Sequence, residues 1–213
     1  MPLGFRFANT EQKLPSPEEL ASTFCVTAKA STDIWSKPPA THRFNAPILY
    51  KPIPLTSFQR ARVRFSARWT TLYDQAGLIL VLNPDDGSRR KWIKTGIEFL
   101  DNSPHISTVT KDRWADWSLL SIPPNVTGAG RDLEDDDDEK RTGVTIEMER
   151  RARDQTLWVY LIDDKGNRIP IREVTWAFEE EETVECWIGV YVARPAKDDG
   201  LGELDVTFSK LEV

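Results

Sequence analysis

Two neighbouring segments, residues 73–82 and 91–99, alternate between apolar and polar side chains with a period of two. Such alternation is typical of β-strands that bury one face. The aliphatic side chains expected to enter the core are Ala76, Leu78, Leu80 and Leu82 in the first segment, and Ile93, Ile97 and Phe99 in the second. A turn-forming run, Asn83-Pro84-Asp85-Asp86-Gly87-Ser88, separates the two segments. We therefore predict an antiparallel hairpin with one face in the core.

The opposite face of this hairpin has a different composition. It carries Tyr73, Gln75, Trp92, Lys94 and Glu98, with glycines at 77 and 96 between them. A face that is only solvated seldom combines aromatic rings, an amide and opposite charges with glycines. We therefore predict that this face is a binding surface.

Further short segments with the same alternation follow along the chain, and turn residues separate them. The expected strands are 24–29, 58–71, 103–110, 114–122, 143–149, 155–162, 172–178, 186–193 and 202–213. Five prolines between residues 38 and 54 limit that stretch to loops and short edge strands. No long helical period competes, and only a short helix is expected after Ser16, with Pro17 at its first position. The pattern favours an all-β fold, an antiparallel sandwich or barrel.

The chain has 213 residues, enough for a single sandwich domain with a sizeable core. We expect residues 1–30 to be an irregular lead-in packed on the domain, and residues 31–213 to form one domain. A run of acidic residues from Asp132 to Glu139 predicts a flexible, solvated loop at about 128–142. Calcium would require regularly spaced ligands with a glycine, which this run lacks.

Charge and motifs exclude several classes of partner. The formal net charge is −6, and neither a basic stripe nor a phosphate-binding glycine loop is present, so we expect no nucleic-acid partner. The sequence shows no signal peptide and no apolar run long enough to cross a bilayer, so we expect a cytoplasmic protein without membrane contact.

Cys25 and Cys186 are read as reduced thiols, although a fold that joined them would allow a disulfide. Two isolated histidines, His42 and His105, give no zinc spacing, so we expect no metal and no cofactor.

Several motifs, taken in order along the chain, resemble one family. They are Tyr73-Asp74-Gln75-Ala76-Gly77-Leu78, residues 91–98, Ser107-Thr108-Val109, Trp114-Ala115-Asp116-Trp117-Ser118, residues 157–160, residues 172–178 and residues 189–195. The series is similar to the concanavalin-A-like proteins that include the fungal "regulation of enolase protein 1" group. A more remote likeness is to the β-sandwich at the C-terminus of family 43 β-xylosidases. The resemblance implies a jelly-roll sandwich of two antiparallel sheets, one of them concave, and implies no settled activity.

A ligand site is expected on the concave sheet. Polyol hydroxyls bond to amide, carboxylate and ammonium groups, and aromatic rings pack against sugar faces. The candidate ligand-binding residues are Tyr73, Gln75, Trp92, Lys94, Glu98, Ser107, Trp117, Glu173 and Tyr191. Gly77, Gly96 and Gly189 would leave room for a ligand near the backbone. The alternative is a plain Lys94–Glu98 salt bridge on a solvated sheet.

Three functions fit these residues. The first is binding of a small carbohydrate or sugar-like metabolite, with a regulatory role in carbon metabolism. The second is an enzyme acting on a sugar-derived substrate, with Glu98 and Glu173 as its acid and base, because glycoside hydrolysis uses two carboxylates. The third is an interaction module that regulates a metabolic enzyme of glycolysis, which the resemblance alone suggests.

Overall fold

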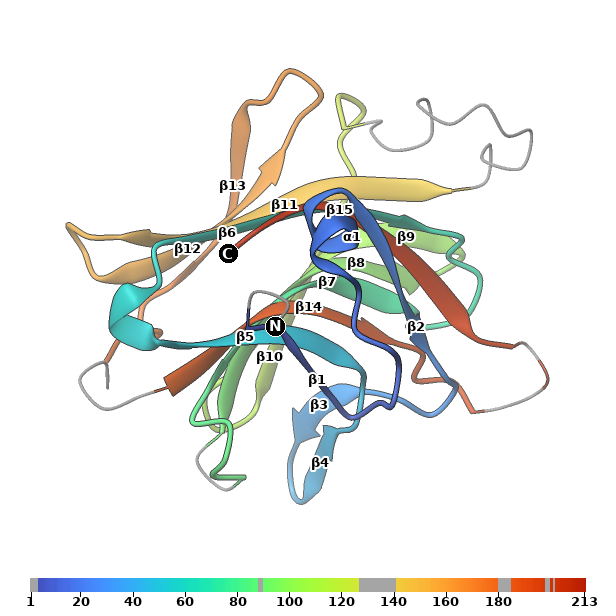
Figure 1. The fold of residues 1–213 in the computed structure, drawn as a ribbon, viewed down its shortest axis with the longest axis horizontal. Helices are drawn as coiled ribbons and strands as arrows, with labels where there is room; N and C mark the ends of the chain where they lie inside the picture. Colours follow the sequence, from blue (N-terminus) through green and yellow to red (C-terminus); the bar gives the residue numbers. More distant parts are fainter. Residues whose placement is uncertain (1–3, 88–89, 127–140, 180–184, 198–199, 201) are drawn as a thin grey trace.

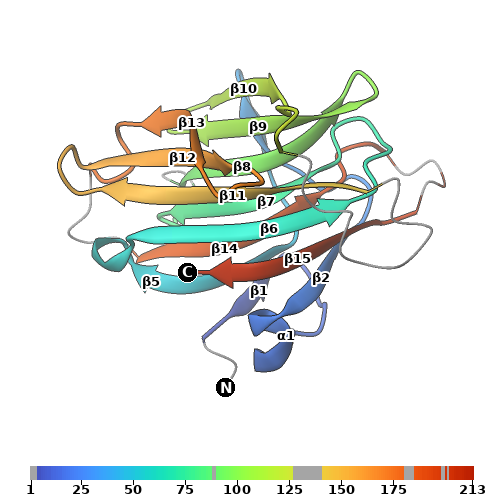
Figure 2. The same cartoon turned by 90° about the horizontal axis from the view of Figure 1, so that it is seen from above.

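The fold is a sandwich of two antiparallel sheets, seen in a computed structural model that describes residues 4–87, 90–126, 141–179, 185–197, 200 and 202–213 (Figures 1 and 2). The seven-stranded sheet has the order β1 (Arg6–Ala8), β5 (Ile48–Pro54), β14 (Glu185–Ala193), β7 (Gln75–Leu82), β8 (Lys91–Leu100), β9 (Ser103–Lys111) and β10 (Ala115–Ser121). The six-stranded sheet has the order β13 (Arg168–Val174), β12 (Thr156–Ile162), β11 (Thr142–Arg151), β6 (Arg60–Ala67), β15 (Leu204–Glu212) and β2 (Thr23–Ala28). The predicted jelly-roll sandwich is confirmed.

The main core lies between the two sheets. The aliphatic face of the β7–β8 hairpin enters it, because Ala76, Leu78, Leu80 and Ile93 belong to the same buried cluster as Phe65 of β6. In the hairpin, Gln75 pairs with Glu98 and Leu82 pairs with Lys91, so the strands are aligned over their whole length. The faces predicted from the period of two are the faces observed.

The proline-rich stretch forms more sheet than its sequence suggested. β5 is not an edge strand, because it lies between β1 and β14. However, β1 pairs only with Ile48–Tyr50, so Pro52 and Pro54 lie beyond that partner. A proline has no N–H to donate, and on this side of Pro52 and Pro54 the described residues form no second strand that would need one.

The N-terminal residues belong to the sandwich. β1 and β2 are the outer strands of the seven-stranded and six-stranded sheets, respectively. The short helix α1 (Pro17–Ala21) begins at the expected cap, where Ser16 and Glu19 form a reciprocal capping box. Residues 4–30 are thus less irregular than the expected lead-in. Most of the predicted acidic loop at 128–142 lies outside the described residues.

A small hairpin, β3 (Ile34–Lys37) paired with β4 (Thr41–Phe44), packs on the face of the seven-stranded sheet that points away from the main core (Figure 1). We call this face the outer face. Beneath the hairpin is a second apolar cluster made of Ile34, Ala46, Ile48, Tyr50, Ile79, Val81, Trp92, Val109, Tyr191 and Ala193. Part of the face predicted to bind a ligand is therefore a second core. None of the helices in the described residues has the length and apolar character needed to cross a bilayer.

Candidate functional site

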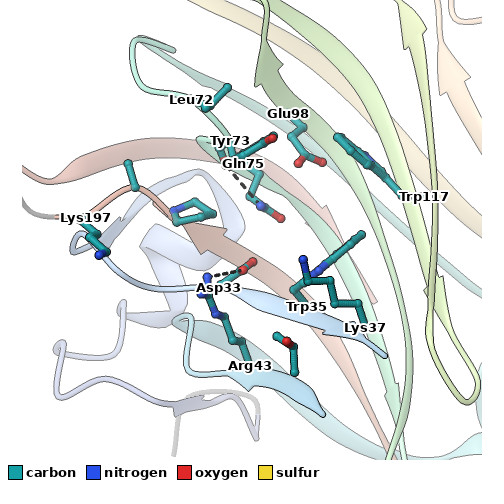
Figure 3. A pocket seen from close by; sticks show the side chains of 13 residues that line it. Asp33, Trp35, Lys37, Arg43, Leu72, Tyr73, Gln75, Glu98, Trp117 and Lys197 are labelled. Carbon is teal, nitrogen blue, oxygen red and sulfur yellow. Dashed lines mark hydrogen bonds and ion pairs between the residues drawn. The ribbon is translucent and has the colours of Figure 1, made fainter. Parts of the chain in front are cut away.

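A cavity of about 690 Å³ opens at one end of the outer face, between the β3–β4 hairpin, the starts of β7 and β10, the end of β8 and the segment after β14 (Figure 3). Its volume is in the usual range for small-molecule sites. The lining residues are Asp33, Trp35, Lys37, Thr41, Arg43, Leu72, Tyr73, Gln75, Glu98, Trp117, Pro195, Ala196 and Lys197.

Glu98 is a nearly buried carboxylate in the wall of this cavity, with 6% of its surface exposed. Its Oε2 accepts a hydrogen bond from Ser107 Oγ at 2.8 Å, and Ser107 Oγ also accepts from Trp117 Nε1 at 3.2 Å. Burial raises the pKa of Glu98, although Lys94 and the Ser107 hydroxyl favour its charged form. The cavity therefore contains an oriented carboxyl group that is protonated more readily than an ordinary glutamate.

Gln75 lies directly opposite Glu98 in the β7–β8 pair and is held at both ends of its amide. The ammonium of Lys94 donates to Gln75 Oε1, and Gln75 Nε2 donates to the carbonyl oxygen of Tyr73 at 3.2 Å. The amide oxygen is thus engaged, and the second N–H of Nε2 is the group left to meet a ligand.

Lys94 is buried below the cavity and does not line it. Its Nζ lies 5.6 Å from the centre of the Trp92 ring and 5.5 Å from that of Tyr191, within cation–π range. Burial lowers the pKa of Lys94, while Glu98 and Asp33 oppose that shift. No ion pair within 4.0 Å joins Lys94 to Glu98 in the described part of the chain, and neither side chain is solvated, so the plain surface salt bridge is not what forms.

Three aromatic side chains surround the polar groups. Trp117 meets Trp35 edge-to-face at 6.0 Å and Tyr73 at 6.2 Å between ring centres. Leu72 and Tyr73 are 50% and 38% exposed, and they are two of the three large apolar side chains that are exposed among the described residues. Exposed apolar groups gathered at a cavity are typical of a binding site.

A buried ion pair positions Tyr73. Arg194 donates to both oxygens of Asp74, and Asp74 also accepts from the backbone N–H of Thr71 at 3.1 Å. Tyr73 itself has a φ of 66° and donates its backbone N–H to Phe99 O at 2.8 Å. A non-glycine residue persists in this left-handed region when its surroundings fix it, which the ion pair and the backbone bond do here.

The β3–β4 hairpin contributes charged groups to the opposite side of the cavity (Figure 3). Asp33, Trp35 and Lys37 alternate along β3 and its preceding residue, so they share one face. Asp33 is 6% exposed and pairs with Arg43 at 3.4 Å. Lys37 and Arg43 are exposed, as is Lys197 after β14.

The structure places the predicted ligand residues in three groups. Tyr73, Gln75, Glu98 and Trp117 line the cavity. Ser107 stands behind Glu98, bonded to it. Buried under the hairpin and outside the lining are Trp92, Lys94 and Tyr191.

The expectation that Glu173 lies on the same sheet is wrong. Glu173 is in β13 and pairs with Trp158 in the six-stranded sheet, where it is exposed. Its side chain does point away from the core, as the alternation predicted, but the alternation does not say which sheet a strand joins. Glu98 and Glu173 therefore cannot act together as acid and base.

The three glycines have a different role from the one expected. A Cβ on Gly96 would lie 1.9 Å from Ala76 O, and one on Gly77 would lie 2.0 Å from Thr95 O. These atoms belong to the neighbouring strand, and Gly189 is similarly close to Leu49 O. The glycines allow close approach of paired strands, and they do not make room for a ligand.

The described residues hold no group of three or more His, Cys, Asp or Glu side chains suited to a metal ion. Cys25 and Cys186 are both free; Cys25 is exposed on β2, and Cys186 is buried on β14 of the other sheet. Burial raises the pKa of Cys186 to about 12, so this thiol is inert.

Comparison with known proteins now places the chain. Residues 9–213 match the family described as "Protein of unknown function (DUF1349)". "Uncharacterized protein AN7484" of Emericella nidulans is 52% identical over 208 residues, which cover 98% of this chain and 94% of that one. "Regulation of enolase protein 1" of Saccharomyces cerevisiae is 40% identical over 58 residues, 27% of each protein. The chain belongs to this family of unknown function, and the resemblance inferred from its motifs is confirmed.

Solved structures share the fold. A functionally unknown protein from Saccharomyces cerevisiae aligns with a TM-score of 0.70 and 20% identity, over 98% of this chain and 95% of that one. A mutant of the GH43 protein BlXynB from Bacillus licheniformis aligns with a TM-score of 0.52 and 10% identity, over 88% of this chain and 32% of that one. At these identities the likeness shows the β-sandwich and no function.

Proposed function

We propose that the cavity binds a small carbohydrate or a sugar-derived polyol. The observation that carries this proposal is the arrangement of Trp35, Tyr73 and Trp117 around Gln75 and Glu98 in one cavity. A sugar ring presents C–H groups on its faces and hydroxyls on its edge. Aromatic rings match the faces, while a carboxylate and an amide N–H match the hydroxyls.

The polar groups are already oriented, which supports the proposal. Gln75 is fixed by Lys94 and by the Tyr73 carbonyl, and Glu98 is fixed by Ser107. Binding therefore requires little ordering of these side chains, and ordering is a major cost of association. A carboxylate that accepts and an amide N–H that donates favour a ligand with adjacent hydroxyls, since each hydroxyl can do both.

The test is calorimetric titration of the protein with neutral mono- and disaccharides, supported by ligand-observed NMR. We expect Tyr73→Ala to weaken binding about 3- to 10-fold through lost ring contact. Glu98→Gln should weaken it about tenfold or more, because hydrogen bonds to a charged group are the stronger ones. Trp158→Ala, on the other sheet, is the matched aromatic control and should leave affinity unchanged. If no sugar in the panel binds, or if Tyr73→Ala and Glu98→Gln both bind like the wild type, the proposal fails.

A second candidate is an enzyme acting on a sugar-derived substrate, and the raised pKa of Glu98 favours it. A buried carboxyl with a raised pKa holds its proton more tightly and can act as a general acid, and Asp33 is the other carboxylate among the described lining residues. Glu98 and Asp33 would take the two roles, in place of the pair Glu98 and Glu173. Turnover of aryl glycosides by the wild type that is lost in both Glu98→Gln and Asp33→Asn would establish the enzymatic function. Binding of sugars without turnover would support the carbohydrate-binding function and contradict the enzymatic one.

A further inference from the structure

The charges that line the cavity are segregated. Among the described lining residues, the two carboxylates, Asp33 and Glu98, are nearly buried, whereas the three cations, Lys37, Arg43 and Lys197, are exposed. The described part of the lining therefore has one more cation than anion, in a chain whose formal net charge is −6.

The cations are arranged along one side of the cavity. Figure 3 shows Lys37, Arg43 and Lys197 on the side of the hairpin and the segment after β14, opposite Glu98, with the Arg43–Asp33 pair between the two lysines. Arg43 already forms an ion pair with Asp33, with 3.4 Å between Nη1 and Oδ2. Within the described part of the chain, Lys37 and Lys197 have no carboxylate within 4.0 Å. These two exposed ammonium groups are therefore the lining cations that no described carboxylate engages.

We propose that the ligand is an anionic sugar derivative, with its hydroxyls towards Gln75 and Glu98 and its anionic group, a phosphate or a carboxylate, at the mouth beside Lys37 or Lys197. This inference rests on the carbohydrate-binding function proposed above and names the chemical class of its ligand. An anion at the mouth remains partly solvated, so its desolvation is small while the neighbouring ammonium group attracts it. The same anion at the inner wall would meet the Glu98 carboxylate and be repelled.

The geometry also gives each part of the ligand its own partners. The rings of Trp35 and Trp117 belong to the same lining and meet edge-to-face, with 6.0 Å between ring centres, so the apolar faces of the sugar can pack against them. Lysine suits this role because its ammonium group is a point charge on a flexible stem that can follow the anion. Recognition of the hydroxyls and recognition of the anion are therefore separable by mutation.

The experiment titrates the full-length protein with matched probes: glucose, galactose and mannose, each beside its 6-phosphate and its uronic acid. Inorganic phosphate alone is the control for an anion that binds without a sugar. We expect at least one anionic probe to bind about 3- to 10-fold more tightly than its neutral parent, the size that a few exposed ion pairs provide. This preference should diminish as salt is raised from 50 to 500 mM, since exposed charges are screened.

Two variants test the assignment of residues. Lys37→Ala combined with Lys197→Ala should remove the preference for the anionic probe and change the affinity for the neutral parent less than twofold. Lys165→Ala, in the turn between β12 and β13, is the matched control and should change neither. Both substituted side chains are exposed, so the double variant should melt like the wild type.

The outcomes separate the two proposals. Equal binding of neutral and anionic probes overturns the anionic ligand and leaves the carbohydrate site standing. The same holds for a preference that persists in the double variant. Tight binding of inorganic phosphate without any sugar binding, or no binding of any probe, overturns both.

Discussion

Arg194 and Asp74 form a buried ion pair with two hydrogen bonds, Nε to Oδ1 at 2.8 Å and Nη2 to Oδ2 at 2.7 Å. Asp74 is fully buried and also holds the backbone N–H of Thr71. Arg194 follows the last residue of β14 and leads directly to Pro195, whereas Asp74 follows Tyr73. The pair therefore ties together two segments that line the cavity but lie about 120 residues apart in sequence.

Removing one partner should be strongly destabilising. We expect Arg194→Met to lower the free energy of unfolding by about 3–5 kcal/mol, because it leaves the Asp74 carboxylate buried without its cation. Urea unfolding followed by tryptophan fluorescence measures the change. Arg43→Met is the matched control: its pair with Asp33 is largely exposed on the arginine side and should contribute no more than about 1 kcal/mol. Equal losses in the two variants would contradict this account.

The face of the β7–β8 hairpin was predictable because alternation is a local property of the chain. Once Leu78 and Leu80 are assigned to the core, Gln75 must point the other way, and Glu98 follows from the pairing of the two strands. Which other segment packs over the outer face of the hairpin depends on contacts between residues far apart in sequence, so alternation does not predict it. Trp92 and Tyr191 were correctly expected to point away from the main core, yet they are buried because the β3–β4 hairpin packs over them.

That hairpin explains most of the cavity residues that the sequence did not reveal. Its strands have four residues each, and Pro38 and Pro39 separate them, so the stretch resembled a loop. The alternation Ile34-Trp35-Ser36-Lys37 was the available signal, since Ile34 is buried and Trp35 lines the cavity. Pro195–Lys197 had no signal, because the position of this segment depends on Arg194.

Substitution of Gly96 tests whether glycine is required there because the two paired strands approach closely. The Cβ of Gly96→Ala would lie 1.9 Å from Ala76 O, a backbone atom in the paired strand, so the sheet must shift. We expect a loss of about 3 kcal/mol in the free energy of unfolding, the upper part of the range for overpacking. Gly87→Ala is the control, because among the described residues nothing lies within 4 Å of its added Cβ. If Gly96→Ala instead melts like Gly87→Ala, close approach of the strands is not the reason for the glycine.

The raised pKa of Glu98 predicts a pH-dependent stability difference. Because burial raises this pKa, the folded protein holds the proton more tightly than the unfolded chain. The resulting stabilisation is fully present below the unfolded pKa of about 4.3 and is lost as pH rises through the folded pKa. Glu98→Gln has no such proton.

Wild type should therefore lose stability relative to Glu98→Gln as pH rises above about 4.3. Urea unfolding of both proteins at several pH values between 4 and 8 measures the difference. Glutamine keeps an oxygen that can accept from Ser107, so the comparison changes the charge more than the packing. A difference that stays constant across this range would show that the Glu98 carboxyl titrates as it does in the unfolded chain.

Lys94 should influence binding without contacting the ligand. Its ammonium donates to Gln75 Oε1 from below the cavity, so it orients the amide that lines the cavity. Lys94→Met keeps the length and apolar stem but removes this bond, and Gln75 is then free to rotate. We expect the affinity for the sugar probe to fall about fivefold, the effect of one hydrogen bond worth about 1 kcal/mol. In a Gln75→Ala background the same substitution should have no further effect, since the side chain that Lys94 orients is gone. A full additional loss in that background would mean that Lys94 acts through Glu98 or contacts the ligand itself.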